Sequence, residues 1–104
     1  MANNNTSTIL NDVKSILGYG TNKLDTPINN FILAGKKDLM EAGVVSSKVV
    51  ETDPLIYSAL VSYVLSMIDT YEFRELSANA YFLQKNQLRH YGDYNGAVSE
   101  NNEE

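Results

Sequence analysis

The sequence predicts an all-α fold, a compact bundle of four helices with room for a fifth. Three observations support this prediction. Apolar residues recur at helical spacing in four separate segments. Two prolines each follow a residue that can cap a helix, in Thr26-Pro27 and Asp53-Pro54. Glycines follow the ends of periodic segments at Gly18, Gly43 and Gly92, where a glycine can stop a helix.

The first helix is expected at residues 9–17. Thr8 can cap its free N–H groups, and Gly18 can take the left-handed conformation that ends it. Its apolar face comprises Ile9, Val13, Ile16 and Leu17. The glycines that follow belong to neither a GxxxxGK[ST] nor a GxGxxG pattern, so we interpret this loop as a turn rather than a phosphate site.

The second helix is expected to start at Pro27, with Asp25 or Thr26 as its cap, and to end at Gly43. Gly35 in its middle allows a neighbouring helix to approach closely. Its inward face comprises Ile28, Phe31, Ile32, Leu39 and Ala42. On the opposite side Leu33 and Met40 stand one heptad apart. They are either two ordinary exposed side chains or a contact strip for another subunit.

A valine-rich loop follows at residues 44–52. Its β-branched residues are Val44, Val45, Val49 and Val50, and they favour an extended path. We expect either a short strand or an extended arm that packs on a neighbouring subunit.

The third helix is expected from Pro54 to about Tyr71, and it is apolar around most of its circumference. Its one polar stripe comprises Ser58, Ser62, Ser66 and Asp69. A helix of this kind is a buried one. Either the other helices wrap it or a second copy of the chain covers part of it, and the second alternative indicates oligomerisation.

The last helix is expected to begin between residues 72 and 77 and to end near Gly92. The face expected to pack inward comprises Phe73, Leu76, Ala80 and Leu83, continued by Gln87 and Tyr91. Tyr81, Phe82 and Leu88 lie off that face, so the helix carries more apolar surface than one contact needs.

The two ends differ from the body in composition. Residues 1–7 are polar and residues 93–104 are acidic, and both are expected to be disordered around a single domain at residues 8–92. The net charge of −5 belongs mostly to the end, since no Lys or Arg follows Asp93. The body has no basic patch of the kind that phosphate binding requires, and neither a signal peptide nor a membrane span is expected.

The residues offer little for catalysis. The chain has no cysteine and one histidine, His90, which is expected at the negative end of a helix dipole. No HExxH, EF-hand or Glu-x-x-His spacing occurs. We therefore predict no enzyme activity, no catalytic or metal-binding residues and no cofactor.

The sequence resembles the head–tail connector family of tailed bacteriophages and prophages, small adaptor proteins also described as DNA-packaging proteins. The resemblance covers residues 8–92 and depends on the order and spacing of short segments. These segments are Leu10-Asn-Asp-Val-Lys-Ser-Ile-Leu-Gly18, Asp25-Thr-Pro-Ile28, Glu41-Ala-Gly-Val44, Asp53-Pro-Leu-Ile56 with Ala59 and Tyr63-Val64, and Leu88-Arg-His-Tyr-Gly92. The Gly18–Gly20 loop and the acidic end match no feature of the family.

The resemblance implies a helical subunit that forms a ring with copies of itself, a dodecamer in this family, beneath the portal protein of the phage head. Such a ring extends the DNA channel, with DNA only as passing cargo, and carries the stopper and tail proteins. The implied location is the virion, after assembly in the host cytoplasm. A ring needs two different complementary surfaces on each subunit. The candidate interface residues are Leu33, Met40, Val44, Val45, Val49, Val50, Tyr81, Phe82 and Leu88.

Two other classes of function stay open at this point. A small helical DNA-binding regulator would need Lys and Arg concentrated on one helix, whereas the basic residues here are scattered apart from Lys36-Lys37. A host adaptor protein is compatible with the same sequence. An enzyme would need a pocket that brings His90 together with two carboxylates.

Overall fold

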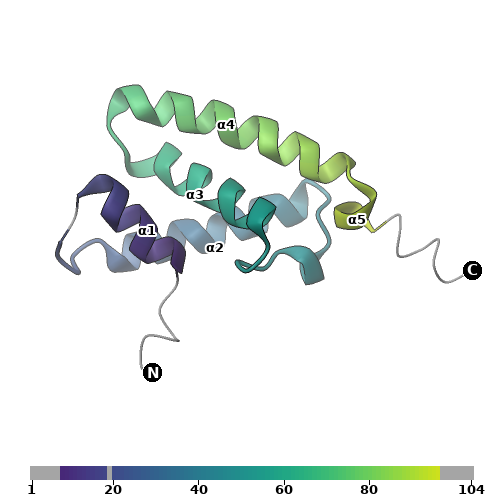
Figure 1. Ribbon diagram of the computed structural model, residues 1–104, viewed down its shortest axis with the longest axis horizontal. Helices are drawn as coiled ribbons and strands as arrows, with labels where there is room; N and C mark the ends of the chain where they lie inside the picture. Colours follow the sequence, from purple (N-terminus) through teal and green to yellow (C-terminus); the bar gives the residue numbers. More distant parts are fainter. Residues whose placement is uncertain (1–7, 19, 97–104) are drawn as a thin grey trace, which may run out of the picture.

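The computed structural model describes residues 8–18 and 20–96, and Figure 1 shows their helices. The elements are α1 (Thr8–Leu17), α2 (Asp25–Glu41), the 3-10 turn η2 (Ser46–Lys48), α3 (Pro54–Ile68), α4 (Tyr71–His90) and α5 (Gly92–Asn95). No strand occurs among these residues, which confirms the all-α prediction. The disorder expected for residues 1–7 and 97–104 concerns positions outside the described residues.

Helix α3 is the centre of the fold. It packs against α1, α2 and α4, and Figure 1 shows α4 along one side of it and α1 and α2 on the other. Its buried side chains are Ile56, Ala59, Leu60 and Val64. The other helices of the chain therefore cover most of α3, while Leu55 and Met67 at its two ends stay 47% and 42% exposed.

Helices α2 and α3 meet at Gly35, as the sequence predicts. A methyl group at this position would lie 3.0 Å from both Leu60 Cδ2 and Tyr63 Cδ2. Glycine therefore permits a close contact here, and a larger residue would require Leu60 and Tyr63 to shift.

The start of α2 differs from the prediction and its end agrees with it. The helix begins at Asp25, two residues before Pro27, and Asp25 forms an ion pair with Lys14 at 2.8 Å instead of capping the helix. At the other end Gly43 has a φ of +118°, and the Val44 N–H donates to the Leu39 carbonyl at 3.0 Å. This arrangement is the left-handed glycine end that the sequence favours.

The polar stripe of α3 faces α4. Ser58 Oγ accepts a hydrogen bond from Gln84 Nε2 at 2.8 Å, and Ser62 and Ser66 are half-buried. Helix α3 ends at Ile68, three residues earlier than expected, and α4 begins at Tyr71, so that a short turn connects the two helices. Small side chains along this stripe let the two helices form the largest helix–helix contact of the described fold.

The prediction for the inward face of α4 is wrong. Phe73, Leu76 and Leu83 are exposed, whereas Tyr81 and Leu88 are buried against the core. The Tyr81 ring packs edge-on against Tyr63 of α3, with centroids 5.1 Å apart. The face of α4 that meets α3 is the one that carries Tyr81, Gln84 and Leu88, and its contacts with Tyr63 and Ser58 cannot be read from the apolar periodicity of α4 alone.

The valine-rich loop folds back on its own chain. It forms the 3-10 turn η2 rather than a strand, and Val44 and Val49 are buried in the core. The Val45 N–H donates to the Tyr94 carbonyl at 2.8 Å. Residues 93–96 therefore contradict the predicted disorder, because α5 is attached to this loop.

Candidate assembly surfaces

A carboxylate on α2 joins that helix to α4. Asp38 Oδ2 accepts a hydrogen bond from the Tyr81 hydroxyl at 2.5 Å and from Lys85 Nζ at 3.0 Å. Partial burial raises the pKa of Asp38, but these two donors outweigh it and leave the pKa below its ordinary value. Burial, together with the bond to Asp38, raises the pKa of Tyr81 well above its ordinary range.

A second carboxylate joins α3 to α5. Asp53 caps α3 by accepting from the Leu55 and Ile56 N–H groups, and its Oδ2 accepts from the Tyr94 hydroxyl at 2.8 Å. Burial raises the pKa of Asp53, but these bonds and the nearby Lys48 charge lower it overall. Burial and the bond to Asp53 raise the pKa of Tyr94 to about 12.

These two pairs suit a structural role. A carboxylate with a lowered pKa stays ionised and a tyrosine with a raised pKa keeps its proton, so neither exchanges protons near neutral pH. His90 lies exposed at the end of α4, where its Nδ1 donates to the Asn86 carbonyl at 2.7 Å. No group of three His, Asp or Glu side chains suited to a metal ion occurs in the described part of the chain.

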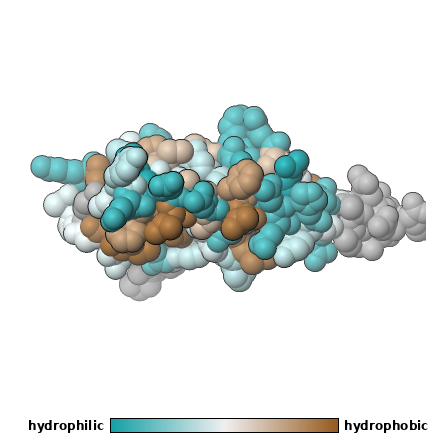
Figure 2. Space-filling view, turned by 90° about the horizontal axis from the view of Figure 1, so that it is seen from above, coloured by the Kyte–Doolittle hydropathy of each residue, from teal (hydrophilic) through white to brown (hydrophobic). Residues whose placement is uncertain are grey.

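The outer side of α4 carries an uncovered apolar surface. The α4 strip, which we define as Phe73, Leu76 and Leu83, has side chains that are 52%, 62% and 63% exposed. Figure 2 looks onto the molecule from above and shows hydrophobic side chains in separate groups among hydrophilic ones. The strip belongs to the most regular apolar face of α4, yet it contacts no core within the subunit.

A second uncovered surface lies on α2. The α2 strip, which we define as Leu33 and Met40, is 62% and 40% exposed. The buried side of this helix holds Ile28, Ile32 and Leu39. The prediction that Leu33 and Met40 lie off the inward face of α2 is therefore confirmed, while their role in a contact is not established by exposure alone.

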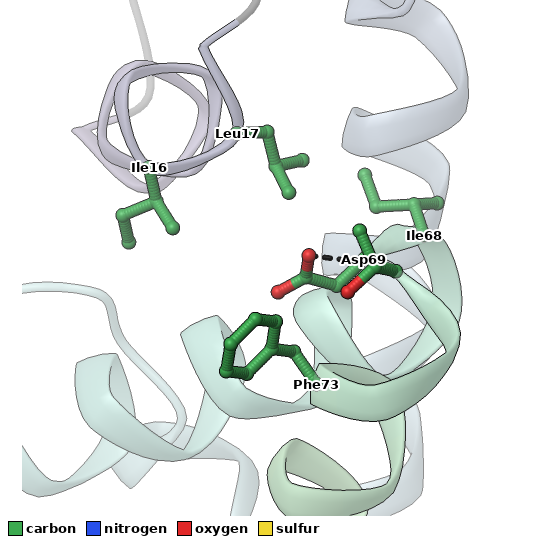
Figure 3. Close-up of a pocket in the computed structure, with 6 residues that line it drawn as sticks. Ile16, Leu17, Ile68, Asp69 and Phe73 are labelled. Atoms are coloured by element: carbon green, nitrogen blue, oxygen red, sulfur yellow. Dashed lines mark hydrogen bonds between the residues drawn. The ribbon is translucent and has the colours of Figure 1, made fainter.

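A groove adjoins the α4 strip at the start of α4. It has a volume of about 630 Å³, and Figure 3 shows Ile16 and Leu17 reaching from the end of α1 toward Phe73. Ile68 and the Asp69–Thr70 turn complete its wall. Ile16 is 58% exposed although the sequence places it on the inward face of α1, so the apolar surface extends from the α4 strip onto α1.

The structure divides the nine predicted interface residues into two groups. Leu33, Met40, Val50 and Phe82 are exposed, and Val45 is half-buried. Val44, Val49, Tyr81 and Leu88 are buried within the subunit. These four must be removed from the candidate surface, because the core of their own chain already covers them.

Sequence reasoning missed the α4 strip and Ile16 as surface residues. It assigned the longest apolar line of α4 to the core, which is the usual rule for a helix that packs once. The missed signal was the line Ser77, Tyr81, Gln84 and Leu88 at alternating four- and three-residue spacing. Ser77 and Gln84 of this line are small or polar, and Gln84 bonds to Ser58 in the polar stripe of α3.

Comparison of the chain with protein-family models, curated proteins and solved structures finds no match. Among the described residues, none of the helices has the combination of length and apolar character needed to cross a membrane.

Proposed function

We propose that this chain is a structural subunit that assembles with copies of itself into a ring at the head–tail junction of a tailed bacteriophage. In this role it lies beneath the portal protein, extends the channel through which DNA passes and carries the stopper or tail proteins. The virion is then its location, and no cofactor takes part.

The uncovered α4 strip carries this proposal. Apolar side chains at this spacing on one helix normally pack against something, and here they stay 52–63% exposed within the described chain. The segments that resemble the connector family indicate which assembly covers them. A ring places a second copy beside each subunit.

Three of the eight Lys and Arg residues are paired within the described part of the chain, which favours this role over that of a DNA-binding regulator. Lys14, Lys36 and Lys85 each form an ion pair with a carboxylate of the same chain, at 2.8, 2.9 and 3.0 Å. Paired lysines are poorly available to phosphate groups. A protein that surrounds passing DNA also benefits from weak attraction to it.

The test is the solution mass across a concentration series, measured by light scattering after size exclusion, with and without a portal protein. We expect rings, or oligomers that form only with the portal. The double variant Leu76→Lys/Leu83→Lys should remain folded by circular dichroism and lose assembly, because two charges enter the strip.

A matched control exists on the same helix. Tyr71→Lys changes a side chain that is 79% exposed and lies about 120–140° around α4 from Leu76 and Leu83, at 100° per residue. We expect this variant to assemble like the wild type. A wild-type chain that stays monomeric at every concentration with the portal present contradicts the ring proposal, and steeply salt-dependent binding to duplex DNA then favours the regulator.

A further inference from the structure

The α2 and α4 strips both lie away from the hydrogen bond that joins their helices. The hydrogen bond between Asp38 and Tyr81 reaches from α2 to α4, and both of these helices pack on α3. In α2, Leu33 and Met40 stand five positions before and two positions after Asp38. In α4, Leu76 and Leu83 stand at the same distances from Tyr81. At 100° per residue both positions lie about 140–160° around the helix from the bond. Each strip therefore lies on the side of its own helix that is turned away from this bond.

The two strips also have the same length. Leu33 and Met40 are seven residues apart, as are Leu76 and Leu83. At 1.5 Å per residue each pair spans about 10.5 Å along its helix. A helix carrying one pair can lie along a helix carrying the other, with both pairs in contact at once.

The charges around the strips are complementary. Glu72 and Glu75 are exposed beside Phe73 and Leu76, and together with Asn79 they line a hollow of about 460 Å³. Lys37 is exposed beside the α2 strip and forms no ion pair within the described residues, and Glu41 is exposed one turn further along the same side. Two carboxylates beside the α4 strip and the unpaired Lys37 beside the α2 strip favour contact between unlike strips over contact of the α4 strip with itself.

We infer that the α4 strip of one copy docks along the α2 strip of the next copy, in a head-to-tail contact. This inference rests on the self-assembly proposed above and names the surfaces that perform it. A two-fold contact that pairs the α4 strip with itself leaves the α2 strip uncovered and brings like faces together. A head-to-tail contact covers both strips on every subunit of a closed ring.

Cysteine cross-linking tests the pairing cleanly because the chain has no cysteine of its own. Leu33→Cys, Leu76→Cys and Leu83→Cys are prepared as separate full-length proteins and treated with a short thiol-reactive cross-linker under conditions in which the wild type assembles. We expect cross-linked dimers when the first variant is mixed with the second or third, and none from any variant alone. The stronger of the two mixed pairs gives the relative direction of the helices.

Asn11→Cys on the exposed side of α1 is the matched control, and it should not cross-link to Leu33→Cys. Cross-linking of Leu76→Cys with itself overturns the head-to-tail pairing in favour of a two-fold contact. Rings without any cross-link between the strips overturn the pairing and leave the proposed function standing. Cross-linked strips in a protein that never joins a portal support the pairing and contradict the connector role.

Charge reversal gives a second readout. Glu75→Lys and Lys37→Glu should each weaken self-association about two- to fivefold at low salt, the range of exposed ion pairs. A mixture of the two variants should recover wild-type mass, because each then offers the charge that the other requires. A mixture that remains as weak as either variant contradicts the proposed complementarity.

Discussion

Replacing Tyr81 by Phe isolates one hydroxyl group that joins α4 to α2. The variant keeps the ring that packs on Tyr63 and lies beneath Lys85, and it removes only the 2.5 Å bond to Asp38. A hydrogen bond to a charged group contributes about 1.5–3 kcal/mol. Because the Asp38 side chain is 40% exposed and keeps Lys85 as a partner, we expect a loss of about 1–2 kcal/mol.

The assay is thermal and urea unfolding followed by circular dichroism. For a domain of this size a loss of 1–2 kcal/mol lowers Tm by roughly 5–15 °C. The urea midpoint should fall with an unchanged slope, since the surface exposed on unfolding stays the same. Tyr71→Phe is the control, because this side chain is 79% exposed and its hydroxyl makes no hydrogen bond within the described residues.

The pH dependence gives a further check on Tyr81→Phe. The pKa of Asp38 is lower in the folded protein than its ordinary value of 3.8. The contribution of this group is therefore fully present above 3.8 and is lost as pH falls through the folded pKa. The difference in stability between wild type and variant should shrink in acid. An equal Tm for the two proteins at neutral pH, or a loss as large in Tyr71→Phe, refutes the reasoning.

Two further predictions concern the backbone of the fold. Gly35→Ala gains about 1 kcal/mol of helix propensity but places a methyl group 3.0 Å from α3, and because such overpacking costs about 1–3 kcal/mol we expect net destabilisation. Ala34→Gly, at the neighbouring exposed position, measures the contribution of helix propensity alone in the same urea assay. If Gly35→Ala is more stable than the wild type, the side chains of α3 can move to accept the methyl group and the expectation is wrong. Asp53→Ala removes the cap of α3 and the partner of Tyr94, so a loss of at least about 1 kcal/mol is expected at pH 7. Since the pKa of Asp53 is lowered in the folded state, the loss of stability should diminish as pH falls below about 4. Hydrogen exchange should show faster opening of α5 in this variant. A loss of stability that is independent of pH contradicts the assigned role.

Local rules predicted the helices and most of their ends. Pro54 with its Asp53 cap starts α3 where the sequence places it, and Gly43 ends α2 in the left-handed conformation expected of it. These features depend on a few neighbouring residues, so the sequence contains the information. The start of α2 moved to Asp25 because an ion pair with Lys14, eleven positions away, competes with the local cap.

The sequence by itself determined that this chain is helical, where its glycines permit turns and close contacts, and that it has few residues suited to catalysis. Only the tertiary structure decided which face of α4 is buried. Periodicity measures how apolar a face is, whereas packing depends on the shape and chemistry of the partner. Here α3 offers the Tyr63 ring to Tyr81 and the Ser58 hydroxyl to Gln84. The more apolar face of α4 was thereby left on the surface, where the proposed assembly begins.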